Sequence, residues 1–407
     1  MHKIELLAPA GDLEKLKTAV RYGADAVYFG GELFSLRASA GNLSIDEMQE
    51  AMEFLHENNA KGYLTINIYA HNEDIEPLKE YVKKIKDVPI DAFIISDPGV
   101  IQIVRDEIPD AEIHLSTQAN TTSYMSALFW VNQGVKRIVT AREMSLKEIK
   151  ELRDHLPDDV EIESFVHGAM CISYSGRCLL SNFMTGRDAN HGQCTHPCRW
   201  KYHLVEEQRP GEYFPIEEDE RGSYIMNSRD LCMLDSLPDM IDAGITSLKI
   251  EGRMKSAYYV ATVVSAYRRA LDAYLENPET YVYDPAWFDE LCKASHREFT
   301  HGFFYHKPTD EDQNYLTSDY VRDYSFIGVV MGEDPDTGET IVQQRNKFSI
   351  GDTIEVMSPR QSFYEETVTT MRDEEGNHIE SAPHPKQVLR IPFEHKPVKY
   401  SILRKKK

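Results

Sequence analysis

Four cysteines gather in one glycine-rich segment with a spacing that suits a metal site. Their pattern is Cys171-x6-Cys178-x15-Cys194-x3-Cys198. Zinc ribbons and knuckles usually separate paired cysteines by two to four residues, whereas four thiolates with irregular loop spacing also suit a 4Fe-4S cluster. We therefore predict an iron-sulfur cluster. Zinc and unliganded buried thiols are the alternatives, and Cys232 is a rival fourth ligand.

A second group of chemically capable residues follows the predicted strands of a β/α barrel, whose carboxyl ends converge on one mouth. Alternating charges at 249, 251 and 253, at the end of an apolar strand, are costly without a partner or a role. Cations at such a mouth bind carboxylates through charge-assisted hydrogen bonds. Taken singly, each residue could instead form a structural ion pair. We predict Glu163, His167 and Glu251 as catalytic residues and, as substrate-binding residues, Arg37, Asn67, Arg142, Lys249 and Arg253.

The elements that must position these residues alternate between short apolar runs and amphipathic helical stretches, which is typical of parallel strands with crossover helices. Eight strands close a TIM-like (β/α)8 barrel. An apolar run at 224–226 either inserts a strand or replaces one of the eight. An open doubly wound sheet is the alternative, but residues 9–12 lack its glycine-rich nucleotide fingerprint. The predicted strands are 5–8, 26–29, 63–68, 92–96, 112–116, 137–140, 161–166 and 247–250.

Helix signals and a change of pattern divide the chain into two domains. A capping box at 44–47 begins a helix over 46–58, Gly23 and Gly134 end helices, and further helices are predicted at 256–276 and 285–296. Short alternating strands follow, at 325–330, 339–344, 352–357 and 366–370. We predict a barrel domain at 1–315, with a cysteine-rich insertion at 168–200, and a small C-terminal antiparallel β-barrel or sandwich at 318–407.

Composition limits the classes of function. The 407 residues carry a net charge of -22, which argues against a protein that coats nucleic acid uniformly. No apolar run approaches the length of a membrane span, and the N-terminus lacks the features of a secretory signal, so we expect a cytoplasmic protein without membrane contact. Residues 383–407 carry +7, as either a solvated basic tail or a source of phosphate contacts.

Several ordered motifs resemble one known family. The run Glu163-Ser-Phe-Val-His-Gly-Ala-Met-Cys171-Ile-Ser-Tyr-Ser-Gly-Arg-Cys178 resembles the signature of the collagenase-like peptidase family 32, of unknown catalytic type. Motifs at 7–11, 23–28, 209–213, 224–228 and 247–253 are similar to the same family. Within it, Gln193-Cys194-x3-Cys198-Arg199-Trp200 most resembles the tRNA 5-hydroxyuridine synthases.

This resemblance implies prephenate-dependent hydroxylation of the wobble uridine in the tRNA anticodon loop. It also implies a 4Fe-4S cluster on Cys171, Cys178, Cys194 and Cys198. Ubiquinone-pathway members of the family use a cysteine at the place of Cys232 instead of one at the place of Cys198, so the fourth ligand stays open. The expected partners are tRNA, a small dicarboxylate and a second chain, in a homodimer or a heterodimer with a paralogue.

Two other classes of function stay open. A collagenase-like peptidase is the alternative enzyme, although the sequence has no His-Glu-x-x-His or Gly-x-Ser-x-Gly motif, and His167 with Cys171 is its only nearby thiol-imidazole pair. A non-catalytic RNA-binding or assembly factor is the third possibility, and it predicts a basic surface with no redox-active centre.

Overall fold

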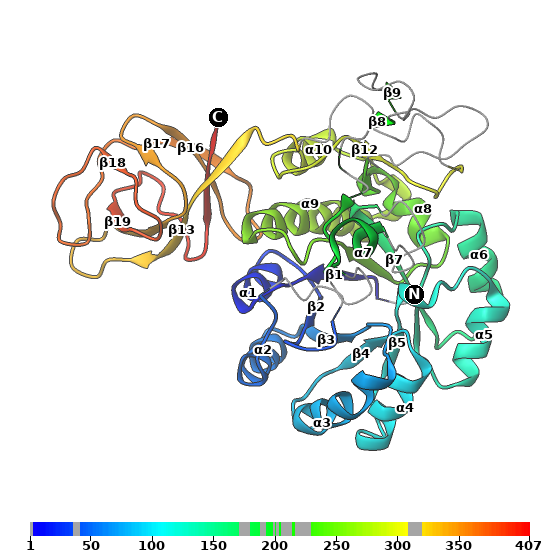
Figure 1. The fold of residues 1–407 in the computed structure, drawn as a ribbon. Helices are drawn as coiled ribbons and strands as arrows, with labels where there is room; N and C mark the ends of the chain where they lie inside the picture. Colours follow the sequence, from blue (N-terminus) through cyan, green and yellow to red (C-terminus); the bar gives the residue numbers. More distant parts are fainter. Residues whose placement is uncertain are drawn as a thin grey trace.

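Eight parallel strands form a closed barrel in the computed structural model, which describes residues 3–35, 41–170, 180–187, 193–197, 200, 203–204, 214–215, 229–307 and 320–407. Neighbouring strands pair in chain order, and β11 pairs with both β7 and β1, which closes the ring (Figure 1). All eight predicted strands are confirmed. They are β1 (Glu5–Pro9), β2 (Ala26–Gly30), β3 (Lys61–Ile66), β4 (Ala92–Ile95), β5 (Ile113–Leu115), β6 (Arg137–Val139), β7 (Glu161–Ala169) and β11 (Ser247–Ile250).

Helices surround the barrel, and several of the predicted helix starts and stops are confirmed. The Ser44 hydroxyl accepts from the Glu47 amide and the Glu47 carboxylate accepts from the Ser44 amide, which is the predicted capping box. Gly23 and Gly134 follow α1 and α5 at φ of +117° and +80°, a conformation that favours glycine. The helices are α1 (Leu13–Arg21), α2 (Ile45–Glu57), α3 (Ile75–Ile85), α4 (Pro98–Glu107), α5 (Tyr124–Asn132), α6 (Leu146–His155), α7 (Leu180–Thr185), α8 (Leu237–Asp242), α9 (Ala257–Glu276) and α10 (Pro285–Leu291).

Two short strands are added beside the barrel, and one predicted helix is shorter than expected. The strand β10 (Asp230–Cys232) pairs antiparallel with the end of β7, and β12 (Phe299–Thr300) extends it in parallel. Both strands are additions to the ring of eight, whereas 224–226 lies outside the described residues. The helix predicted to 296 ends at Leu291, so Cys292 follows the helix and is half-buried instead of lying midway along it. Two short strands, β8 (His203–Leu204) and β9 (Phe214–Pro215), pair with each other.

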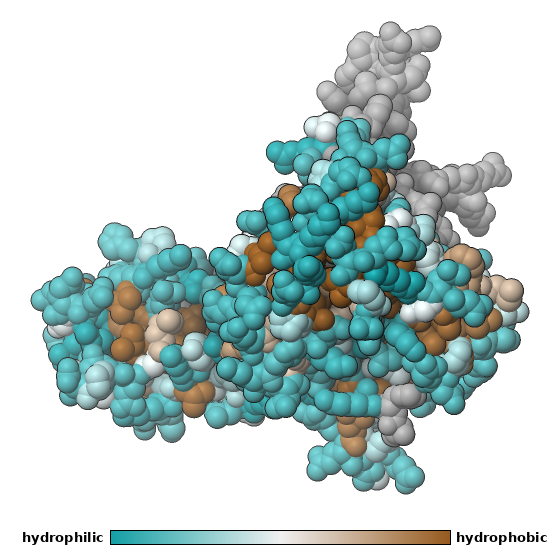
Figure 2. Space-filling model, turned by 90° about the horizontal axis from the view of Figure 1, so that it is seen from below, coloured by the Kyte–Doolittle hydropathy of each residue, from teal (hydrophilic) through white to brown (hydrophobic). Residues whose placement is uncertain are grey.

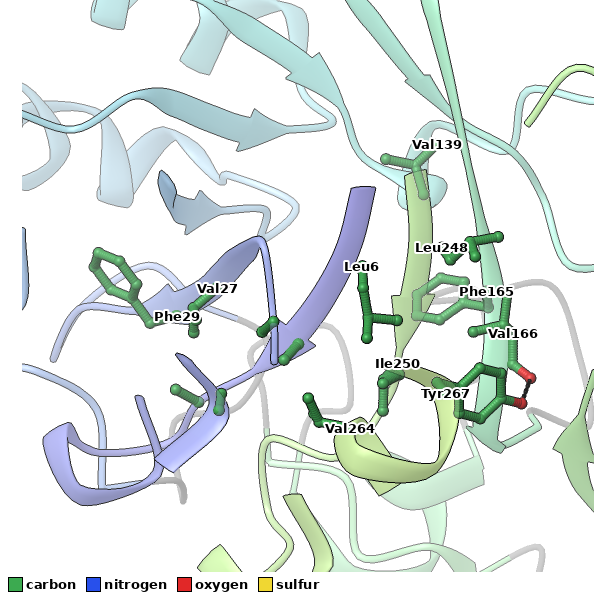
Figure 3. Packing of buried hydrophobic residues seen from close by; sticks show 14 of the residues in the cluster. Leu6, Val27, Phe29, Val139, Phe165, Val166, Leu248, Ile250, Val264 and Tyr267 are labelled. Atoms are coloured by element: carbon green, nitrogen blue, oxygen red, sulfur yellow. Dashed lines mark hydrogen bonds between the residues drawn. The ribbon is translucent and has the colours of Figure 1, made fainter. Parts of the chain in front are cut away.

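Successive side chains of the barrel strands point to opposite faces, and this separates two apolar layers. Leu6, Val27 and Phe29 belong to the large core between strands and helices, whereas Leu7 and Tyr28 belong to a smaller cluster formed by the opposite face of the strands. Figure 3 shows part of the large core, in which Tyr267 of α9 donates a 2.7 Å hydrogen bond to the Val166 carbonyl. This bond satisfies a buried hydroxyl and attaches α9 to β7.

The C-terminal domain is an antiparallel sheet beside α9 and α10 (Figure 1). Its six main strands pair in the order β17-β16-β20-β13-β14-β19, and no pairing among the described residues joins β17 to β19. The predicted antiparallel β domain is therefore confirmed, but its main sheet is an open half-barrel instead of a full barrel. The strands are β13 (Tyr324–Glu333), β14 (Thr340–Gln344), β15 (Phe348–Ser349), β16 (Thr353–Met357), β17 (Tyr364–Thr367), β18 (Ser381–Ala382), β19 (Val388–Ile391) and β20 (Ile402–Lys406).

The basic segment at 383–407 is not a solvated tail. Strand β20 lies between β13 and β16, and Arg404 is fully buried. Arg404 pairs with Glu290 of the barrel domain at 2.6 Å and with Glu355 of β16 at 2.6 Å. Lys405 pairs with Asp352 at 2.8 Å. These charges stabilise the domain, and deletion of the segment would remove a central strand.

Hydrophilic residues cover most of the face seen in Figure 2, and hydrophobic residues form separate patches on it. Within the described ranges, no helix is long and apolar enough to cross a bilayer.

Candidate active site at the barrel mouth

Charged and aromatic side chains meet at the carboxyl ends of β2, β6, β7 and β11. Arg142 lies 3.8 Å from the Glu251 carboxylate, and its guanidinium lies 3.9 Å from the centroid of the Phe165 ring. The Tyr28 hydroxyl donates to the Ile250 carbonyl at 3.0 Å and to Glu251 at 3.4 Å. The mouth therefore holds a cation on an aromatic face next to a carboxylate, an arrangement suited to a charged substrate.

Arg253 connects the loops around this mouth. Its guanidinium donates to the Ser35 hydroxyl at 2.6 Å, the Thr65 hydroxyl at 3.2 Å and the Asn42 side chain at 2.5 Å. A Cβ on Gly30 would lie 2.1 Å from Nη2 of Arg253, so only glycine leaves room for this contact. The donors of Arg253 bind protein oxygens, which suits a residue that positions the mouth.

Glu163 and Lys249 form an ion pair inside the barrel. Their side chains are 0% and 5% exposed, and Lys249 Nζ lies 2.5 Å from Glu163 Oε1. Burial would raise the pKa of the Glu163 carboxyl, but Lys249 and Arg137 together lower it below its ordinary value. Glu163 is therefore ionised, and it holds the Lys249 ammonium 4.5 Å from the centroid of the Tyr28 ring.

Below this pair, charges at the amino ends of the strands compensate one another. Arg137 lies 2.6 Å from Glu5 and 3.1 Å from Glu163, and the Ser247 hydroxyl donates to Glu5 at 2.8 Å. Burial would raise the pKa of Glu5, yet Arg137, Tyr63 and Ser247 lower it to about 2. This network fills the amino end of the barrel, opposite the mouth.

His167 lies near the end of β7, away from the charged pair. Its ring packs 5.6 Å from that of Tyr267 and 5.5 Å from that of Phe299. Burial, with help from Lys255 and His296, lowers the pKa of His167 to about 3. The imidazole is therefore neutral at physiological pH.

The structure brings together only part of the predicted site. Cys171, Cys178 and Cys198 lie outside the described residues, as does Arg37. Asn67 follows β3 and is half-buried. The described portions contain no cluster of three or more His, Cys, Asp or Glu side chains that could hold a metal ion.

The two described candidate ligands differ in their surroundings. Cys194 is exposed, and the next residue, Thr195, donates its amide to the Ser181 hydroxyl of α7 at 3.1 Å. Cys232 is 5% exposed and packs in the large core, 3.8 Å from the Tyr267 hydroxyl. Burial raises the pKa of the Cys232 thiol to about 12. Cys194 is therefore the more accessible of the two to a metal ion.

The aromatic walls of the mouth and the partners of its charges were not predicted from the sequence. Tyr28 and Phe165 flank Lys249, and Arg137 compensates both Glu5 and Glu163. Side chains alternate between the two faces of a strand, so Phe165 shares a face with Glu163, and Ser247 shares one with Lys249. This alternation was the signal that could have placed Phe165 and Ser247 beside the charged residues.

Comparisons with known proteins agree with this architecture. The model described as "Peptidase family U32" matches residues 11–314, and that described as "Peptidase family U32 C-terminal domain" matches residues 322–404. The chain is 44% identical to "tRNA hydroxylation protein P1" of Bacillus subtilis (strain 168), covering 100% of this chain and 95% of the relative. It is 38% identical to "tRNA hydroxylation protein P" of Escherichia coli (strain K12), over 94% and 92% of the two chains.

A further relative acts on another RNA, according to its name. The "23S rRNA 5-hydroxycytidine C2501 synthase" of Escherichia coli (strain K12) is 35% identical, and the match covers 82% of this chain and 49% of that protein. The family models together span both domains, and the first two relatives match along nearly their whole length. The chain belongs to peptidase family U32.

Proposed function

We propose that this protein is a tRNA-modifying enzyme that hydroxylates the wobble uridine at C5, with prephenate as co-substrate and an iron-sulfur cluster as cofactor. The observation that carries the proposal is the charged mouth of Arg142, Lys249 and Glu251, which adjoins the strand leading into the cysteine segment. The names of two relatives that match nearly the whole chain support tRNA hydroxylation.

In this proposal, Cys171, Cys178, Cys194 and Cys198 hold the cluster. Strand β7 ends at Ala169, so Cys171 follows within two residues of the barrel rim. The burial of the Cys232 thiol in the large core favours Cys198 over Cys232 as the fourth ligand. Such a cluster supplies one-electron redox chemistry when it is bound. Zinc on the same thiolates is the alternative that metal analysis must exclude.

The charged side chains of the mouth would bind and orient the dicarboxylate. Arg142 and Lys249 supply positive charge beside the rings of Phe165 and Tyr28, with Arg37 and Asn67 as further proposed contacts. Arg253 holds the loops that surround them. Of the three proposed catalytic residues, Glu163 acts by positioning Lys249, and His167 acts as a neutral imidazole. Glu251 is the carboxylate at the mouth, and we propose that it moves protons during the reaction.

The tRNA anticodon loop is the proposed macromolecular substrate. A uridine in a single-stranded loop can leave its stack at low cost and enter a pocket. The overall charge of -22 implies that phosphate contacts are local and do not cover the surface.

The test combines metal analysis with nucleoside mass spectrometry. Protein purified without oxygen should contain about four iron and four sulfide ions per chain, and it should form 5-hydroxyuridine in tRNA when prephenate is present. Cys194→Ser should lose the iron and reduce product formation by at least about 100-fold, because loss of a ligand costs at least as much as loss of its outer-shell support.

Cys292→Ser is the matched control, because Cys292 is half-buried beyond α10 and outside the proposed ligand set. It should retain both iron and activity. A colourless protein with one zinc ion would contradict the cluster. Cleavage of collagen peptides without any change in tRNA would instead support the peptidase alternative.

A further inference from the structure

One side of the barrel mouth carries buried polar atoms without partners. Within the described part of the chain, Ser96 Oγ, Gln118 Oε1, Asn120 Oδ1 and Thr121 Oγ1 are buried and make no hydrogen bond. Ser96 follows β4 directly, and the other three residues follow the neighbouring strand β5. Native proteins leave few buried polar atoms unsatisfied, so such a group at a barrel mouth points to a ligand.

Gln118 is held firmly although its side-chain oxygen lacks a donor. Its backbone carbonyl accepts a 2.7 Å hydrogen bond from the Tyr69 hydroxyl and a 3.1 Å bond from the Asn120 side-chain amide. The neighbouring Thr117 hydroxyl donates to the Thr140 carbonyl at 3.0 Å. Gln118 is 8% exposed, so its backbone is fixed and its side chain has little free space before any ligand arrives.

The Asn120 side chain shows which kind of atom is missing. Its amide nitrogen donates to the Gln118 carbonyl, so the unpartnered Oδ1 is an acceptor. Gln118 Oε1 is an acceptor as well. Both require a ligand that donates an N–H or O–H group. The carboxylate groups of an ionised dicarboxylate supply only acceptors, so they do not fit this side of the mouth.

The two sides of the mouth therefore differ in chemistry. The side formed by β6, β7 and β11 carries Arg142, Lys249 and Glu251, whereas the four unpartnered atoms after β4 and β5 belong to neutral side chains. An uncharged ring with an N–H donor between two carbonyl oxygens complements the neutral side. The uracil base has this pattern, with N3–H flanked by O2 and O4.

We propose that Gln118, supported by Ser96 and Asn120, forms a subsite that binds the target uracil and accepts a hydrogen bond from its N3–H. This inference rests on the proposed function, because it identifies the part of the mouth that holds the base. The charged side then holds the co-substrate, and the two ligands meet across the barrel axis.

The experiment is a double-mutant cycle between protein and RNA. The iron-loaded wild type and Gln118→Met, which keeps the length of the side chain without its acceptor, are titrated with two anticodon stem-loops. One stem-loop carries uridine at the target position and the other carries 3-methyluridine, which has no N3–H. Wild type should bind the 3-methyluridine RNA roughly 10- to 100-fold more weakly than the uridine RNA. For Gln118→Met, the dissociation constants of the two RNAs should agree within about twofold.

The proposal would be overturned if methylation of N3 reduced the RNA affinity of wild type and of Gln118→Met by the same factor. If Gln118→Met does not fold, Ser96→Ala provides the second variant, and it should also reduce the effect of N3 methylation. Gln133→Met is the matched control, because Gln133 is exposed at the end of α5, and it should behave as wild type.

The titration also separates this proposal from the proposed reaction. It measures RNA binding and needs no turnover, so N3–H-dependent binding without any 5-hydroxyuridine would contradict only the hydroxylase. Hydroxylation with normal rates and no dependence on N3–H would contradict only the subsite. The KM for the co-substrate should not change in Gln118→Met, because the charged side of the mouth is intact. A large increase in that KM would mean that Gln118 supports the whole mouth, and it would count against the subsite.

Discussion

Charged residues inside the barrel are stable because each has a partner of opposite sign. A buried ion pair that loses one member leaves an uncompensated charge, and this costs about 3–5 kcal/mol. Arg137 lies between Glu5 and Glu163, and Glu163 in turn pairs with Lys249. The charge of Lys249 near the mouth thus depends on residues at the opposite end of the barrel.

The low pKa of Glu5 makes the barrel sensitive to acid. Its pKa falls from 4.5 to about 2 on folding, so the stabilisation is complete above pH 4.5 and is lost as the pH falls towards 2. The shift corresponds to about 3 kcal/mol in the free energy of unfolding. We expect Glu5→Gln to destabilise the protein strongly at pH 6 and much less at pH 2, as measured by denaturant unfolding. Glu76→Gln, at an exposed pair with Lys79, should show little dependence on pH, and similar curves for both variants would contradict this account.

The sequence pointed to polar residues of the candidate site but not to their partners. Charges at 163, 249 and 251 stand out in apolar strands, so their importance could be predicted. Their pairing could not, because Glu5, Arg137 and Ser247 meet only when the barrel closes. The difference between Cys194 and Cys232 likewise depends on which side of β10 faces α9, which local spacing does not reveal.

Among the elements, the end of β7 connects the mouth with the cysteine segment. Gly168 has φ of +108°, and a Cβ there would lie 2.8 Å from the Glu251 carbonyl oxygen. Gly376 has φ of +86° with nothing within 4 Å, so alanine there meets only the backbone strain. We expect Gly376→Ala to cost about 1 kcal/mol and Gly168→Ala clearly more, because backbone atoms must also move.

Thermal unfolding measures the stabilities of Gly168→Ala and Gly376→Ala, and iron analysis over time measures how well each variant retains iron. Gly168→Ala should lose iron faster than wild type, and Gly376→Ala should not. Equal effects of the two substitutions on iron would show that the end of β7 has no role in placing the cysteine segment.

The strands and helices of the barrel were predictable because local patterns determine them. Apolar runs bounded by turns marked all eight ring strands, and Ser44 with Glu47 marked the start of α2. The sequence suggested a basic tail at strand β20 because the partners of Arg404, Glu290 and Glu355, lie far away in the sequence. Charge composition alone cannot distinguish a solvated lysine-rich end from a central strand with buried partners.

At the scale of the whole molecule, Arg404 connects the two domains. It is fully buried between Glu290 and Glu355, and Lys293 also pairs with Glu355 at 2.9 Å. We expect Arg404→Met to reduce the free energy of unfolding by about 3–5 kcal/mol, since Glu290 and Glu355 lose a buried cation and are left to share Lys293. Lys405→Met, which removes a partly exposed pair, should cost less than about 1 kcal/mol. Calorimetry of both variants tests this, and equal effects would mean that the domains do not depend on Arg404.

The closure of the barrel has a consequence for the newly made chain. Glu5 and Ser247, which share a hydrogen bond, are 242 residues apart. At about 5–20 residues per second, a ribosome needs roughly 10 to 50 seconds to travel between them. Throughout that interval β1 has one unpaired edge and an ionised Glu5 without its final neighbours. The growing polypeptide is therefore expected to rely on chaperones that shield such edges until translation has delivered β11.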